Sequence, residues 1–230
     1  MTLRVEPLTT AGLVRAVQIL ATRDQNLQSL VNLNGIPPLW ARRPGFATLV
    51  WIILGQQVSL SSAAAACRRL TRGVGRITPG NVHACSLPAL QRLGLTRQKA
   101  RSCRDLAAAV IEVRLDLRGL DVADPDHVRE QLTAVMGIGP WTADIYLLMA
   151  LRHPDIWPRG DLALYESMRA FTGTRRTAAQ LDRHANAWRP YRSVAARILW
   201  HGYLAERRRA SRQAMPKGAD KWSCKPDRPG

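Results

Sequence analysis

Met136-Gly-Ile-Gly-Pro-Trp-Thr-Ala-Asp144 decides the fold of this chain, together with the Pro/Gly-rich loop that follows it and ends at Asp161. Gly137 and Gly139 flank a single apolar residue, and helical patterns lie on both sides of them. Two glycines in such a turn let backbone N–H groups approach a phosphate without obstruction by Cβ atoms, at the N-terminus of the next helix. The segment therefore predicts a clamp for a backbone phosphate beside a carboxylate.

The composition indicates a globular protein with an anionic partner. The 230 residues carry a formal net charge of +17 with a pI of about 11.2, and 46% of them are apolar. This balance favours a nucleic acid as partner, with a membrane surface or a ribosome as the alternatives. The chain has 30 arginines and four lysines. Arginine suits bidentate contacts with phosphate, but a GC-rich coding bias would give the same excess.

The cysteines and the apolar segments give no sign of secretion or of a membrane span. Cys67, Cys85, Cys103 and Cys224 form no Cys-x-x-Cys pair, no zinc-like spacing and no array for an iron–sulfur cluster. The most apolar stretch, Phe46–Leu54, is too short to cross a bilayer. We expect a cytoplasmic, nucleoid-associated protein of bacterial type, with reduced thiols and no contact with membranes.

Helical periodicity recurs along the chain, and no segment shows a convincing strand pattern. The start and stop signals predict roughly a dozen helices, at about 10–21, 24–33, 46–54, 61–72, 79–85, 87–93, 96–113, 125–135, 140–152, 161–171, 177–188 and 192–208. We therefore predict an all-α protein with one domain over residues 1–205. Residues 206–230 hold eight basic and three acidic residues, and we expect a flexible basic tail that either lies along DNA or is a solvated charged end.

Four ordered sequence blocks resemble the helix-hairpin-helix DNA glycosylase superfamily, and most closely its 3-methyladenine DNA glycosylase II branch. The blocks are Ile53-Leu-Gly-Gln-Gln-Val-Ser59, Met136-Gly-Ile-Gly-Pro-Trp-Thr-Ala143, Arg159-Gly-Asp-Leu162 and Trp188-Arg-Pro-Tyr-Arg-Ser193. The resemblance covers residues 40–205 and implies two helical lobes with DNA across the cleft between them and a damaged base flipped into that cleft. The chain departs from longer family members because about forty residues of helical character precede Phe46, where those members have a β-rich domain.

Asp161 is the predicted catalytic residue. An aspartate at the start of a helix is by default an N-cap, and that role is compatible with catalysis. Excision of a base leaves positive charge on C1′ of the sugar, and a carboxylate in a dry cleft stabilises this oxocarbenium ion. Such a preorganised charge can supply several kcal/mol, and each 1.4 kcal/mol corresponds to about a tenfold change in rate.

Trp141 bears on the type of reaction. The resemblance implies that glycosylases with strand-nicking lyase activity carry a lysine at this position, whereas this chain has no lysine between Lys99 and Lys217. A Schiff base with the sugar then lacks a nucleophile, so we predict a monofunctional enzyme that leaves an abasic site. Trp141 also suits the wall of a pocket, where an aromatic face attracts a cationic base; the alternative is a core tryptophan.

Three further aromatic residues are candidates for the base pocket. Tyr191 falls where the family tends to carry an aromatic residue near the base, with simple packing as the alternative. Tyr146 is adjacent to the second pocket position of the family, which is Ile145 in this chain and removes a stacking surface. Trp40 is a candidate to compensate from the N-terminal segment.

The candidate DNA contacts include the hairpin and the turn after Leu54. We expect the amides of Gly137, Ile138 and Gly139 to hold a phosphate with Thr142 nearby, although a plain turn between helices is the alternative. The resemblance also implies a monovalent cation on the carbonyls of Met136 and Ile138.

Gln57 sits where close family members present a wedge that fills the gap left by the flipped base; the alternative is a polar residue that turns the chain. Arg192 is a candidate phosphate contact, as are Arg42, Arg43 and Arg197, although each one is also compatible with a solvated surface charge. The histidines show no ligand pattern.

The sequence thus predicts a monomeric glycosylase that acts on double-stranded DNA and excises alkylated purines such as 3-methyladenine and 7-methylguanine. It needs no cofactor. One alternative is a helix-hairpin-helix protein that binds DNA without catalysis, and the other is a glycosylase for uracil, hypoxanthine, or mismatched or oxidised bases.

Overall fold

The computed structural model describes residues 6–173 and 176–213, and in this part of the chain all regular secondary structure is helical, with no strand. The first half contains α1 (Thr10–Arg23), α2 (Gln25–Asn34), α3 (Phe46–Gly55), α4 (Leu60–Val74), α5 (Pro79–Ala84), α6 (Leu87–Arg92) and α7 (Arg97–Ile111). The second half contains η1 (Gly119–Val122), α8 (Pro125–Thr133), α9 (Pro140–Met149), α10 (Leu162–Thr172), α11 (Ala178–His184), η2 (Ala185–Trp188) and α12 (Arg192–Gln213). The predicted all-α fold is confirmed.

The capping residues explain most helix starts. Thr96 accepts a hydrogen bond from the amide of Lys99 at the start of α7, and Asp124 caps α8, which has proline in its first turn. The ends of the helices differ more from the sequence-based prediction than their starts do. The hairpin helix stops at Met149, and α12 runs through Gln213, so the predicted boundary at residue 206 lies inside a helix. The predicted tail beyond residue 213 lies outside the described residues.

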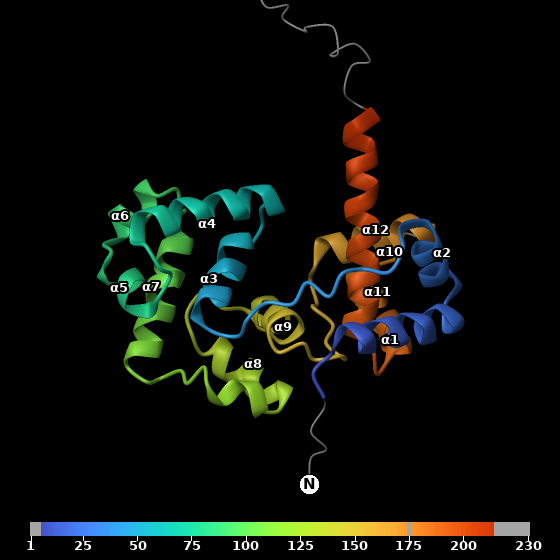
Figure 1. Ribbon diagram of the computed structural model, residues 1–230, viewed down its shortest axis with the longest axis horizontal. Helices are drawn as coiled ribbons and strands as arrows, with labels where there is room; N and C mark the ends of the chain where they lie inside the picture. Colours follow the sequence, from blue (N-terminus) through green and yellow to red (C-terminus); the bar gives the residue numbers. More distant parts are fainter. Residues whose placement is uncertain (1–5, 174–175, 214–230) are drawn as a thin grey trace, which may run out of the picture.

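The helices form two groups that are joined through α9 (Figure 1). In one group α3 packs on α4, α7 and α9, α5 and α6 pack on α7, and α8 packs on α9. In the other group α12 packs on α1, α2 and α10, and α11 follows α10. Residues 35–45 cross from the second group to the first (Figure 1), so the site at the start of α9 and α10 lies where the two groups meet.

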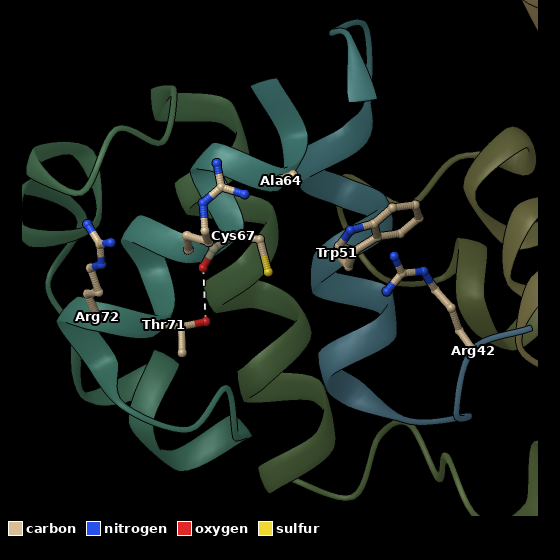
Figure 2. A pocket seen from close by; sticks show the side chains of 7 residues that line it. Arg42, Trp51, Ala64, Cys67, Thr71 and Arg72 are labelled. Carbon is tan, nitrogen blue, oxygen red and sulfur yellow. Dashed lines mark hydrogen bonds between the residues drawn. The ribbon is translucent and has the colours of Figure 1, made fainter. Parts of the chain in front are cut away.

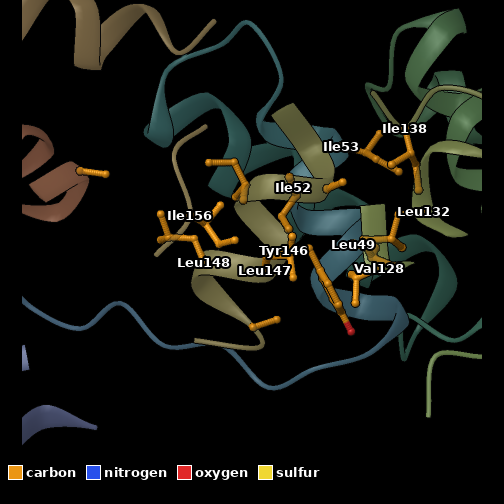
Figure 3. Close-up of a cluster of buried hydrophobic side chains, with 14 of the residues drawn as sticks. Leu49, Ile52, Ile53, Val128, Leu132, Ile138, Tyr146, Leu147, Leu148 and Ile156 are labelled. Carbon is orange, nitrogen blue, oxygen red and sulfur yellow. The ribbon is translucent and has the colours of Figure 1, made fainter. Parts of the chain in front are cut away.

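The first group is held by the apolar surface of α3. Leu49, Ile52 and Ile53 are at most 1% exposed, and they lie close to apolar side chains of α8 and α9 (Figure 3). The predicted role of Phe46–Leu54 as a buried central helix is therefore confirmed.

None of the described helices combines the length and the apolar character that a bilayer crossing requires.

Arg197 is a fully buried cation that links three segments. Its guanidinium donates to the carbonyls of Leu39 at 2.9 Å, Ser193 at 2.9 Å and Leu148 at 2.7 Å. Burial lowers its pKa to about 10. The sequence-based candidacy of Arg197 as a phosphate contact was wrong, because the side chain joins the crossing segment, α9 and α12 inside the protein.

Candidate active site

Asp161 lies at the N-terminus of α10, and three N–H groups fix its carboxylate. Oδ1 accepts from the amide of Leu164 at 3.0 Å and from Trp200 Nε1 at 3.2 Å, while Oδ2 accepts from Trp141 Nε1 at 3.0 Å. The side chain therefore caps the helix and is also held between two indoles. The default reading of Asp161 as an N-cap and the catalytic reading are compatible in this geometry.

The charge of this carboxylate has no counter-ion among the residues that the structure describes. Asp161 is 8% exposed, and it forms no ion pair with any residue in the described ranges. Its three hydrogen-bond donors are neutral. Electrostatic interactions are stronger in such a shielded position than in water, so the site is suited to stabilise a positive charge that arrives with a ligand.

Trp200 is a site residue that sequence reasoning missed. It lies in the middle of α12, is 9% exposed, and contacts an aspartate 39 positions away. Its surroundings, Ile198-Leu-Trp200, are typical of a core helix. Only the packing of α12 on α10 reveals its role, and no local signal could have found it.

Trp141 lies beside Asp161, and its predicted role as the wall of a base pocket stays a prediction. It stands in the first turn of α9, and its half-buried ring packs against the core while Nε1 donates to the carboxylate. The only lysine in the described residues, Lys99, donates from Nζ to the carbonyl of Leu54 at 2.8 Å, and burial lowers its pKa. That amine caps the C-terminus of α3.

The hairpin holds Gly137 in a conformation that no other residue fits. Its φ is +85°, and a Cβ built there would lie 1.9 Å from the hydroxyl oxygen of Ser102. Gln56 supports the turn from the end of α3, because Nε2 donates to the Gly137 carbonyl at 3.3 Å and to the Thr142 hydroxyl at 2.9 Å. The hydroxyl of Thr142 is thus buried and already bonded.

Four amides at the start of α9 remain available for an anion. Within the described chain, those of Gly137, Gly139, Trp141 and Thr142 donate to no acceptor, whereas the Ile138 amide donates to the Val135 carbonyl at 3.1 Å. The predicted phosphate contact through Ile138 is therefore corrected. The others stay predictions, and they form the kind of unbonded helix N-terminus that attracts phosphate.

The carbonyls of Met136 and Ile138 fit the cation that the family resemblance implies. No described N–H or O–H group donates to either of these oxygens, and oxygen ligands suit hard cations. These two carbonyls would hold the ion, which would neutralise charge beside a bound phosphate.

Gln57 is exposed and adopts a φ of +56° directly after the anchored Gln56. The left-handed backbone turns the chain there, and the exposed side chain is free to reach a ligand. Both readings of Gln57 therefore remain open.

Tyr146 is a core residue and not a pocket residue. Its side chain is 0% exposed, and its hydroxyl accepts a hydrogen bond from the amide of Gly45 at 2.9 Å. Burial raises its pKa to about 12. The sequence-based assignment of Tyr146 to the pocket was wrong, because it packs in the cluster around α3 (Figure 3).

The predicted place of Tyr191 near the base stays a prediction. Tyr191 is half-buried just before α12 begins, nine residues before Trp200, which corresponds to about 13 Å along a helix. Trp40 lies beside α12, where its ring makes an edge contact with His201 at 6.2 Å between centroids. The predicted pocket role of Trp40 stays a prediction as well, and the structure adds Trp200 beside Asp161.

Arg192 is bound by Asp155 rather than free for DNA. Its Nε lies 2.8 Å from Oδ1 and its Nη2 lies 3.0 Å from Oδ2. Burial alone would raise the pKa of Asp155, but the hydrogen bonds from Arg192 outweigh it and hold the pKa below its usual range. The prediction of a phosphate contact at Arg192 is corrected. Arg43 is exposed, and Arg42 lies over the ring of Trp51.

Comparison with known proteins identifies relatives of this chain. The sequence pattern of the HhH-GPD superfamily, described as base excision DNA repair proteins, matches residues 50–191. The chain is 32% identical over 157 residues to a probable bifunctional transcriptional activator/DNA repair enzyme AlkA of Mycobacterium tuberculosis, covering 64% of this chain and 31% of that protein. It is 30% identical over 183 residues to DNA-3-methyladenine glycosylase 2 of Escherichia coli, covering 71% and 62%. The chain therefore spans less than two thirds of the length of either relative.

A solved structure shares the fold. The 3-methyladenine DNA glycosylase Mag1 of Schizosaccharomyces pombe, determined with abasic DNA, superposes with a TM-score of 0.75 at 23% identity and covers 81% of this chain and 95% of its own. The resemblance seen in the four sequence blocks is thus confirmed at the level of sequence and of fold.

Proposed function

Because the chain belongs to the HhH-GPD superfamily of base excision DNA repair proteins, we propose that it is a monofunctional DNA glycosylase. It acts as a monomer on double-stranded DNA, excises alkylated purines such as 3-methyladenine and 7-methylguanine, and leaves an abasic site. The relatives named for 3-methyladenine excision support this substrate class.

The environment of Asp161 carries the proposal. Its carboxylate is shielded, held by three N–H donors and not neutralised by any cation within the described residues. As the bond between the base and C1′ breaks, positive charge develops on the sugar, and this fixed negative charge stabilises it without reorganisation. Purines alkylated at N3 or N7 already carry positive charge and leave readily, so the site needs no strong acid to protonate the base.

The rest of the site supports the steps around bond cleavage. The free amides of the hairpin bind a phosphate of the damaged strand, and Gln57 fills the stack after the nucleotide turns outward. Trp141 and Trp200 orient the carboxylate and border the space for the base. Trp141 stands where the resemblance implies a lysine in lyase-type enzymes, and Lys99 is bonded to the end of α3, so no side-chain amine among the described residues is placed to form a Schiff base with the sugar.

The test uses duplexes with a single 7-methylguanine, hypoxanthine or uracil, followed by treatment with alkali. We expect cleavage at 7-methylguanine with the parental protein and none with Asp161→Asn, while the affinity for a duplex with a tetrahydrofuran abasic analogue stays within a few fold. Equal release by the variant would overturn the role of Asp161.

The alternatives give different results in the same assay. Binding to the analogue without release of any base would indicate a protein that only binds DNA. Release of uracil or hypoxanthine alone would indicate another lesion class, and strand scission without alkali would contradict the monofunctional assignment.

A further inference from the structure

A groove lined by arginines lies between α3 and α4, apart from the site at Asp161. A groove of about 490 Å³ is bordered by Arg42 from the crossing segment, Trp51 from α3, and Cys67, Arg68 and Arg72 from α4. Figure 2 shows Arg42 and Trp51 on one side and the α4 side chains on the other. No residue that borders it is acidic.

Arg42 is held in place without an acidic partner. Its guanidinium carbon lies 3.3 Å from the centre of the Trp51 ring, and its backbone amide donates to the Met149 carbonyl at 2.9 Å. Within the described residues its guanidinium makes no hydrogen bond and no ion pair. Stacking of this kind fixes the plane of the guanidinium and leaves its N–H edge free for a bidentate acceptor.

The absence of acids separates this cluster from two arginines that are held by carboxylates. Arg129 is paired with Asp126 and Asp144, and Arg192 is paired with Asp155. In contrast, none of Arg42, Arg68 and Arg72 has an acidic partner among the described residues. Three like charges around one groove repel each other unless an anion binds between them, and phosphate matches the fork of arginine best.

The position along α4 suggests which phosphate this is. The helix starts at Leu60, three residues after Gln57, and Ala64, Arg68 and Arg72 follow Leu60 at four-residue spacing, which puts them on one face of the helix. They lie about 12 and 18 Å along the helix from its start. At 3.4 Å per nucleotide, this distance corresponds to roughly four to five nucleotides of one strand.

We propose that the groove between Arg42, Trp51 and α4 binds a backbone phosphate of the DNA several nucleotides away from the one bound at the hairpin. This inference rests on the proposed function, because it takes DNA as the partner. The groove acts as a second anchor, and Trp51 is the platform that positions Arg42.

The experiment replaces single phosphates by neutral methylphosphonates along both strands of a duplex that contains a tetrahydrofuran abasic analogue. With the parental protein, we expect affinity to fall severalfold at two separate positions, one for the hairpin and one for the groove. With Arg42→Gln, a methylphosphonate at the groove position should no longer lower the affinity, while one at the hairpin position should still lower it. The slope of log K against log salt should fall by about one.

Matched variants exclude a general charge effect and a folding defect. Arg15→Gln removes the same charge from the exposed surface of α1 and should keep both sensitive positions. Trp51→Leu should reproduce the loss seen with Arg42→Gln, and Arg68→Gln with Arg72→Gln should reduce sensitivity at the same phosphate. Circular dichroism and thermal unfolding establish that each variant is folded.

The outcomes separate this inference from the proposed function. If only the hairpin position is sensitive, or if Arg42→Gln keeps both, the groove is not a DNA contact. If neither position is sensitive and the analogue is not preferred, the proposed function fails as well. Inorganic phosphate and dAMP are titrated at constant ionic strength, and submillimolar displacement of the Arg42-dependent contact by either one would identify a small-molecule site and overturn the assignment to DNA.

Discussion

Trp200 Nε1 lies 3.2 Å from Asp161 Oδ1, and this contact joins the middle of α12 to the first residue before α10. Together with Trp141 on Oδ2, it places the carboxylate between two helices that belong to different parts of the fold. The carboxylate of Asp161 is therefore positioned by the packing of α10 and α12 as well as by its own loop.

Trp200→Phe should slow base excision without unfolding the protein. Phenylalanine keeps most of the apolar surface but removes the N–H that binds the carboxylate. A hydrogen bond to a charged group contributes about 1.5–3 kcal/mol, so the single-turnover rate should fall by roughly tenfold to a hundredfold. The rate is measured with 7-methylguanine duplex under saturating enzyme.

Trp188→Phe is the matched control for this substitution. Trp188 Nε1 donates to Asp24 Oδ2 at 2.8 Å, so the same kind of bond is lost away from Asp161. We expect lower stability and an unchanged rate for folded protein. Equal losses of rate in the two variants would show that the Trp200 effect is structural.

Gly137→Ala should destabilise the protein strongly. A left-handed backbone costs a residue other than glycine about 1–2 kcal/mol, and the new Cβ would also overlap the side chain of Ser102. Gly139→Ala is the control, because φ at Gly139 is −92° and no atom outside the adjacent residues lies within 4 Å of the position that the new methyl carbon would take. Thermal unfolding should show a clear loss for the first variant and a small change for the second. Similar melting temperatures would contradict the described hairpin geometry.

Local signals in the sequence were sufficient for the fold class and for half of the site. Thr96, Asp124 and Asp161 are caps that act on residues two or three positions away, and the two glycines of the hairpin act within one turn. Such features depend on short-range geometry, so the helices, the hairpin and the position of Asp161 could be predicted.

The other half of the site depends on contacts between distant residues. No neighbouring residue distinguishes Trp200 from a core tryptophan. Arg192 forms an ion pair with Asp155, and 37 positions separate these two residues in the sequence. The sequence also could not show which side chains of α9 face the site. Residues 142–148 are all buried, so the apolar pattern of this helix gives no preferred face. This is why Tyr146 was assigned to the pocket although its hydroxyl binds the backbone of Gly45.

Tyr146→Phe tests that correction directly. The variant loses one hydrogen bond between the hydroxyl and the Gly45 amide, which should lower the free energy of unfolding by about 0.5–1.5 kcal/mol or slightly more, since the amide is left without a partner. The rate of base excision per folded molecule should not change, because the side chain does not reach Asp161. A large loss of rate with normal stability would return Tyr146 to the pocket. Stability is measured by urea unfolding and the rate by single turnover.

Stability should fall as the pH drops from 7.5 to 5, in part because of His153. Burial, the largest influence, and the nearby Arg129 outweigh the opposing effect of Asp155 and lower the pKa of His153. Its Nδ1 also accepts a hydrogen bond from the Asp155 amide at 3.1 Å, which requires an unprotonated nitrogen. The unfolded chain therefore takes up a proton first, at about pH 6.5, and the folded state loses stability from there down to its own lower pKa.

His153→Gln should flatten this dependence, because glutamine offers an oxygen to the same amide and does not titrate. Part of the slope will remain, since burial and Arg208 also lower the pKa of His201. The exposed His83 provides the control, and His83→Gln should keep the parental slope. The melting temperature is measured at half-unit steps of pH in buffers of equal ionic strength. Parallel curves for the parental protein and His153→Gln would show that His153 is not a source of the acid sensitivity, whereas a steeper fall with acidification for His153→Gln than for the parental protein would reverse the predicted sign.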